Sequence, residues 1–138
     1  MKVSDSLTGY RAMVCGASAG IGKAVALHLA QKGIHCILLA RRENKLLETK
    51  KQIISNGGSA SILIGDLDHR KTIEEKVITE LEKGPIHILI NNTGGPKAGP
   101  ILEASEEEFL QAFSRHVLTS HRLTQLLLPG MTDVGYGR

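Results

Sequence analysis

One glycine-rich segment near the start of the chain constrains the fold more than any other feature. Residues 15–22 read CGASAGIG, a mainly apolar run at 11–15 precedes them, and apolar residues recur at helical spacing after Gly20. The pattern predicts a strand, a tight turn and the first turn of a helix. Glycines let the backbone turn sharply and approach a ligand closely, and a helix N-terminus favours a phosphate. The segment is therefore a candidate nucleotide-phosphate site.

The spacing of the glycines separates two kinds of nucleotide-binding loop. A P-loop requires Gly-Lys followed by Ser or Thr, but here Lys23 is followed by Ala24. Gly16, Gly20 and Gly22 give Gly-x-x-x-Gly-x-Gly, which differs from the Gly-x-Gly-x-x-Gly fingerprint but keeps a dinucleotide interpretation open. A tight strand-to-helix turn without any ligand is the alternative.

Strand and helix patterns alternate along the rest of the chain. Predicted strands cover 11–15, 35–40, 59–65 and 86–91, and predicted helices cover 20–32, 43–55, 68–83 and 105–130. Strands that alternate with helices form parallel sheets with right-handed crossovers. We therefore expect one domain over residues 1–138, with a doubly wound parallel α/β sheet of Rossmann type and strand order 3-2-1-4. In that order the glycine turn lies at the switch point, where ligands bind.

Three motifs make the chain resemble the short-chain dehydrogenase/reductase family. The family's Thr-Gly-x-x-x-Gly-Ile-Gly corresponds to 15–22 with Cys in place of Thr, and its Asn-Asn-Ala-Gly corresponds to Asn91-Asn92-Thr93-Gly94. Its acidic residue after the third strand matches Asp66. The resemblance covers essentially the whole chain and corresponds to the family's N-terminal, cofactor-binding part, so the domain is incomplete relative to the family. Within the family the chain looks most like reductases of 3-oxoacyl thioesters.

The resemblance also implies where a nicotinamide cofactor binds. The pyrophosphate lies on the glycine turn, the adenine beside the acid after strand three, and the nicotinamide ribose near the glycine after strand four. The implied cofactor-binding residues are Gly16, Ser18, Ala19, Gly20, Ile21, Gly22, Arg41, Arg42, Asp66, Leu67, Asn91, Thr93 and Gly94. The plainer interpretations are a turn or helix cap for Asp66 and an ordinary strand-end residue for Asn91.

The residues after the second predicted strand favour NADP(H) over NAD(H). An acidic residue at this place binds a ribose 2′-hydroxyl, whereas an arginine accommodates a 2′-phosphate. This chain has Arg41 and Arg42 and no acid before Glu43. A guanidinium pairs with phosphate through two hydrogen bonds in a fixed geometry. The alternative is that both arginines are solvated loop charges.

The family's catalytic residues are absent from the sequence. The family uses a Ser and a Tyr-x-x-x-Lys just beyond a fifth strand, but Tyr10 precedes the fold and no lysine follows Tyr136 at four residues. The family's helical Asn corresponds in register to His116, which could titrate or simply lie on the surface. We therefore name no catalytic residue. We expect the cofactor-binding part of an NADP(H)-dependent carbonyl reductase, or alternatively an inactive nucleotide- or partner-binding module.

Composition limits the partners and the compartment. Hydrophobic residues make up 41% and charged residues 22%, and the net charge is only +3, as in ordinary globular proteins. Basic residues are not interleaved with aromatics, so nucleic-acid binding is not expected. No segment is long enough to span a membrane, and residues 1–5 lack the apolar core of a signal peptide, so we expect the cytoplasm. Cys15 and Cys36 suit neither a CxxC pair nor a zinc site, so no metal is expected.

Exposed apolar surface is expected at two places. The fourth strand would be an uncovered edge, and the helix from Ser105 would lack a partner for part of its apolar face. We therefore expect a homo-oligomer, with a small-molecule carbonyl compound as the substrate of a complete enzyme.

Overall fold

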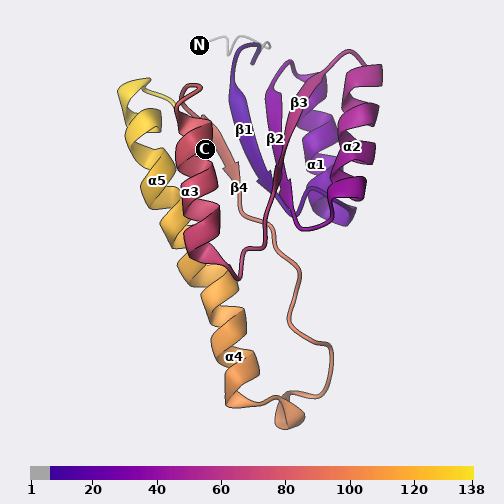
Figure 1. Cartoon of the computed structure of the whole chain (residues 1–138), viewed down its shortest axis with the longest axis vertical. Helices are drawn as coiled ribbons and strands as arrows, with labels where there is room; N and C mark the ends of the chain where they lie inside the picture. Colours follow the sequence, from indigo (N-terminus) through magenta and orange to yellow (C-terminus); the bar gives the residue numbers. More distant parts are fainter. Residues whose placement is uncertain (1–6) are drawn as a thin grey trace, which may run out of the picture.

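The computed structural model describes residues 7–138, which form a parallel sheet with helices on both faces (Figure 1). Residues 1–6, on which the expected compartment partly rests, lie outside the described residues. The elements in chain order are β1 (Arg11–Cys15), α1 (Gly20–Gln31), β2 (His35–Ala40), α2 (Glu43–Ser55), β3 (Ser59–Ile64), α3 (Arg70–Leu81), β4 (Ile88–Ile90), the 3-10 turn η1 (Ile101–Glu103), α4 (Glu106–Phe113), the π-helical segment η2 (Ser114–Leu118) and α5 (Thr119–Asp133).

The sheet has the predicted order, β3-β2-β1-β4, and all its strand pairs are parallel. Strand β1 lies in the middle, because it pairs with β2 on one side and with β4 on the other. Strand β2 is buried along most of its length, as its continuous apolar run predicts. The prediction of a doubly wound Rossmann-type sheet is therefore confirmed.

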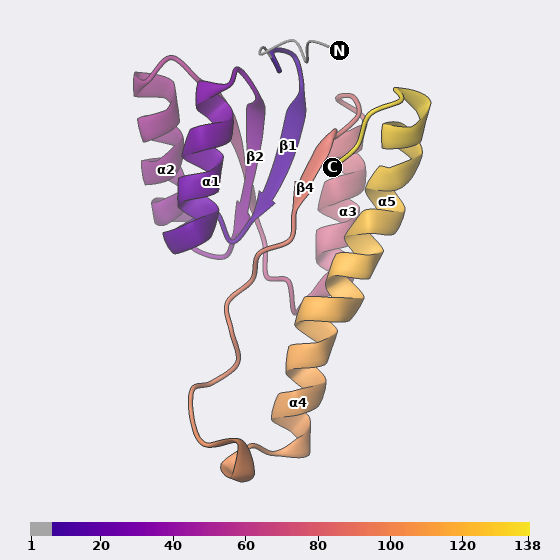
Figure 2. The same cartoon turned by 180° about the vertical axis from the view of Figure 1, so that it is seen from behind.

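Two apolar cores, one on each face, fix the helices to the sheet. Alternate residues of a strand point to opposite faces. Ala12 and Val14 therefore join the core beneath α1 and α2, whereas Met13 and Cys15 join the core beneath α3 and α5. Figure 2 shows the same layers from behind, with α4 and the loop before it extending beyond the end of the sheet.

Several predicted boundaries are wrong, and each has a physical reason. Strand β4 covers only 88–90, since its ladder with β1 ends at Ile90. Helix α3 begins at Arg70 and its N-cap position is His69, because the Asp68 carboxylate accepts hydrogen bonds from a distant arginine. Helix α5 continues through Pro129 to Asp133 although proline lacks a backbone N–H, and its Met131 packs against the core.

The outer edge of β4 is not free along its whole length, contrary to expectation. The N–H of Arg138 donates to the carbonyl of His87 (3.1 Å), and the N–H of Leu89 donates to the carbonyl of Arg138 (2.9 Å). This is the pattern of a parallel bridge opposite Ile88. The end of the chain therefore covers part of the outer edge of β4.

Candidate functional site

A cavity of about 330 Å³ opens at the carboxyl ends of the strands. In a doubly wound sheet the loops after the strands gather at this edge, and each of the four strands contributes one here. The lining residues are Gly16, Ser18, Ala19, Gly20, Leu39, Ala40, Arg41, Arg42, Gly65, Asp66, Leu67, Asn92, Thr93, Gly94 and Arg115.

The three glycines of the turn have different structural roles. Gly16 and Gly20 have φ of +66° and +54°, which side chains rarely adopt. A Cβ on Gly22 would lie 2.7 Å from the carbonyl carbon of Gly16 and 2.8 Å from Asn92 Nδ2, so Gly22 permits close packing within the turn. Gly20 has open space where a Cβ would lie, and it lines the cavity. Ala19 caps α1 without a side-chain bond, which leaves the helix N-terminus suited to an anion.

Asn92, not Asn91, connects the loop after β4 to the glycine turn. Its Nδ2 donates to the carbonyl of Cys15 (3.3 Å). Burial raises the pKa of the Cys15 thiol well above its ordinary value. Neighbouring residues of an extended segment point to opposite sides, so Asn91 lines a second cavity, beside Leu89 and Tyr136. Sequence comparison with the family motif selected Asn91 and missed this contact.

Two arginines give the cavity a positive rim beside the glycine turn. Arg42 Nη2 donates to Ser18 Oγ at 3.0 Å. Arg41 Nη1 lies 3.7 Å from Asp66 Oδ2, and the Arg41 side chain is 71% exposed. Such exposed ion pairs contribute little energy, so both guanidinium groups remain available to an anionic ligand.

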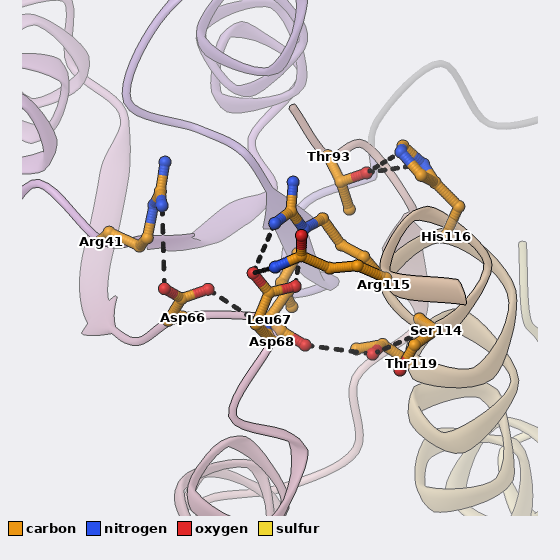
Figure 3. A network of polar contacts seen from close by, with 10 residues as sticks. Arg41, Asp66, Leu67, Asp68, Thr93, Ser114, Arg115, His116 and Thr119 are labelled. Carbon is orange, nitrogen blue, oxygen red and sulfur yellow. Dashed lines mark hydrogen bonds and ion pairs between the residues drawn. The ribbon is translucent and has the colours of Figure 1, made fainter. Parts of the chain in front are cut away.

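Elements α4, η2 and α5 follow one another without a gap and are called the long helix below. This helix holds the loop after β3, on the side of the cavity opposite Arg41 (Figure 3). Arg115 Nε donates to Asp68 Oδ1 at 2.6 Å, and its Nη2 pairs with Oδ2 of the same carboxylate. These hydrogen bonds hold the pKa of Asp68 below its ordinary value. Thr119, which is almost completely buried, donates its hydroxyl to the carbonyl of Leu67 (3.1 Å).

His116 lies next to the loop after β4. Its Nδ1 is 2.7 Å from Thr93 Oγ1, and its ring is exposed. The residue thus contacts Thr93, which lines the cavity, but does not line the cavity itself. The contact shows that the ring is oriented by Thr93, which a purely solvated histidine would not require.

The structure brings most of the predicted site residues together and leaves a few apart. Ile21, Gly22 and Asn91 do not line the cavity, and Ile21 is 74% exposed. Residues that sequence reasoning missed are Leu39, Ala40, Gly65, Asn92 and Arg115. The first three could have been found from their position at strand ends, whereas no sequence signal marks Arg115.

Within 7–138, no group of three His, Cys, Asp or Glu side chains is placed to hold a metal ion. None of the helices in this part of the chain is long and apolar enough to cross a membrane.

Comparison with known proteins assigns the family. The sequence model of the short chain dehydrogenases matches residues 11–138. The chain belongs to the short-chain dehydrogenase family. A ketoacyl reductase of Nostoc is 32% identical over 136 residues, which cover 96% of this chain and 47% of that protein. A dehydrogenase/reductase SDR family member 7 of Mus musculus is 31% identical, over 96% of this chain and 40% of that protein. The chain thus spans about half the length of these relatives.

Solved structures of the family share the fold closely. The 3-oxoacyl (acyl-carrier-protein) reductase of Agrobacterium tumefaciens with NADP bound superposes with a TM-score of 0.89 at 27% identity, over 96% of this chain and 52% of that one. The L-sorbose reductase of Gluconobacter frateurii, in complex with NADPH and L-sorbose, gives 0.88 at 29% identity, over 96% and 51%. The family relationship and the fold are therefore established together.

Proposed function

We propose that the chain binds NADP(H) and forms the cofactor-binding part of a reductase that transfers hydride between NADPH and a carbonyl compound. The observation that carries the proposal is the hydrogen bond from Arg42 to Ser18 at the rim of the cavity. This hydrogen bond is 3.0 Å long, and no carboxylate takes part in it. A guanidinium and a hydroxyl next to the glycine turn suit a 2′-phosphate. The NADP and NADPH bound to the two structural relatives support the same cofactor.

The lining residues fit the rest of such a cofactor. The pyrophosphate would lie over the turn at 16–20, where Gly20 leaves open space for it. The adenine would lie against Asp66 and Leu67, and the nicotinamide ribose near Thr93 and Gly94. Such a cofactor would supply a hydride, and the residues named above would bind and orient the cofactor.

Catalysis needs groups that these residues do not supply. Reduction of a carbonyl requires a proton donor beside the developing alkoxide, and the sequence contains no Tyr-x-x-x-Lys. We therefore assign binding to this chain, and 3-oxoacyl thioesters or related carbonyl compounds as the substrate class of a complete enzyme. Exposed apolar residues of α4, among them Phe109 and Phe113, support assembly into a homo-oligomer.

An inactive nucleotide-binding or partner-binding module is the second candidate. The residues that line the cavity would serve such a module equally well. Both candidates share the cofactor site, so nucleotide affinity tests what they have in common, and turnover distinguishes them.

The test is a titration of NADPH and NADH into the protein, into Arg42→Gln and into Arg41→Gln. Loss of one charged hydrogen bond to a phosphate weakens binding by about 1.5–3 kcal/mol. We expect Arg42→Gln to lose NADPH affinity at least about tenfold with NADH affinity unchanged. Lys45→Gln removes one positive charge on α2, from a lysine paired with Glu48, and serves as the matched control. Equal affinities of the parent protein for NADPH and NADH would contradict the proposal.

A further inference from the structure

The π-helical segment η2 lies between α4 and α5 and turns two adjacent side chains towards different loops. In a π turn the N–H bonds to the carbonyl five residues back, and the N–H of Thr119 bonds to Ser114 in this way. The Thr119 hydroxyl lies 3.1 Å from that carbonyl as well as from the carbonyl of Leu67, and its single proton is shared between the two acceptors. Arg115 reaches Asp68 on one side, and His116 reaches Thr93 on the other (Figure 3).

The segment 66–68 is held to this helix at successive residues. Arg115 pairs with both oxygens of Asp68, a fork-like geometry that fixes orientation as well as distance. The N–H of Asp68 donates to Asp66 Oδ1 (3.0 Å), so the same contact orients the Asp66 side chain. The carbonyl of Leu67, between them, accepts from Thr119 (3.1 Å).

We propose that Arg115 is a positioning residue for the nucleoside end of the cavity. Acting through Asp68, it fixes Asp66 and Leu67 as a preformed wall, so the ligand does not have to order this segment on binding. The inference rests on the proposed nucleotide function. A direct contact between Arg115 and a phosphate is the rival explanation, because Arg115 also lines the cavity. The geometry argues against it, because both Nε and Nη2 already point at Asp68.

The chain provides a matched control pair. Arg122 Nε lies 3.0 Å from Glu74 Oε1, and this pair links α5 to α3. Neither residue lines the cavity. Variants Arg122→Gln and Glu74→Gln therefore remove another arginine–carboxylate pair without touching 66–68.

Affinities of Arg115→Gln, Asp68→Asn and their combination are measured for NADPH, 5′-AMP and nicotinamide mononucleotide. We expect each single variant to weaken NADPH and 5′-AMP about fivefold to tenfold, and the double variant to weaken them little further, because residues acting as one pair are not additive. Nicotinamide mononucleotide affinity stays unchanged, and both controls change all affinities less than about twofold. Arg115→Lys, which restores one charged contact, recovers part of the loss.

Two results would overturn the proposal. One is an additive loss dominated by Arg115→Gln, which indicates direct contact with the ligand. The other is an equal loss in the control variants, which indicates a general effect on stability.

Hydrogen exchange of the amides at 67–69 in the ligand-free protein gives a readout that does not depend on binding. We expect faster exchange in Arg115→Gln and Asp68→Asn and parent-like exchange in the controls; unchanged exchange in all variants refutes the positioning role. If the parent binds neither NADPH nor 5′-AMP, the proposed function fails, and the exchange result still decides whether Arg115 fixes the segment.

Discussion

Gly22→Ala and Gly20→Ala should separate a glycine required for folding from one required for binding. A Cβ at Gly22 would lie 2.7 Å from the carbonyl carbon of Gly16 and closer still to its oxygen. The obstacle is backbone, which cannot rotate away as a side chain can. Overpacking of this kind typically costs about 1–3 kcal/mol. We expect Gly22→Ala to lower the free energy of unfolding by about 3 kcal/mol, the upper end of this range, because the backbone of the turn itself must move.

Gly20→Ala meets no such obstacle. Nothing lies within 4 Å of the added Cβ, so the cost is that of a left-handed φ of +54°, roughly 1–2 kcal/mol. Gly57 is the matched control for the cost of placing alanine at a left-handed φ. It has φ of +80° and equally open space, but it lies outside the cavity. Gly20→Ala and Gly57→Ala should therefore destabilise the protein about equally.

Binding should follow a different order from stability. Gly20 lines the cavity, so a methyl group there would hold a phosphate away from the start of α1, whereas Gly57→Ala leaves the cavity unchanged. The free energy of unfolding is measured by urea denaturation, and NADPH affinity by calorimetry on the folded variants. The reasoning is refuted if Gly22→Ala is no less stable than Gly20→Ala, or if Gly20→Ala binds NADPH as tightly as Gly57→Ala.

Two further predictions concern pH and turnover. Burial lowers the pKa of His87 and of His35 below the ordinary value of 6.5, so the unfolded chain takes up protons first as the pH falls. The free energy of unfolding should therefore be constant above about pH 7 and decrease below pH 6.5. The variant His87→Gln, whose side chain can still accept a hydrogen bond from the Arg11 N–H, should flatten this decrease. A midpoint of urea denaturation as high at pH 5 as at pH 7.5 would contradict the prediction. NADPH consumption by the 138-residue chain with ketones or 3-oxoacyl thioesters should not exceed background; turnover that Gly20→Ala abolishes would contradict this and make His116 the first residue to test.

The sequence predicted correctly the limits of those elements whose pattern is complete within a short segment. Strands β1 and β2 and helix α2 begin and end at the predicted residues, since an apolar run or a capped helical pattern is complete within the segment itself. The strand order follows from the alternation of strands and helices together with the family motifs. The family resemblance, in turn, gave most of the cavity lining, because residues after parallel strands meet at one edge.

Features set by contacts between distant segments could not be predicted in this way. The predicted third helix begins at Asp68, but the carboxylate of Asp68 pairs with Arg115, forty-seven residues later, and the helix begins at Arg70. The choice between Asn91 and Asn92 depends on which of them faces Cys15. The π segment depends on Thr119 bonding back to Ser114, which no apolar periodicity records.

The same distant contacts show why the long helix matters to a site built mainly from strand ends. A parallel sheet fixes where each loop begins, but not the course of the loop beyond the last ladder bond. In this chain, contacts between loops and contacts with the helix restrict the loops further. Arg42 hydrogen-bonds to Ser18, and Asn92 hydrogen-bonds to the carbonyl of Cys15. Segment η2 contacts the loop after β3 through Asp68 and the loop after β4 through Thr93. Since a preformed site loses less entropy on binding than a mobile one, we expect the helix to contribute to affinity mainly by holding loops, although only one of its residues lines the cavity.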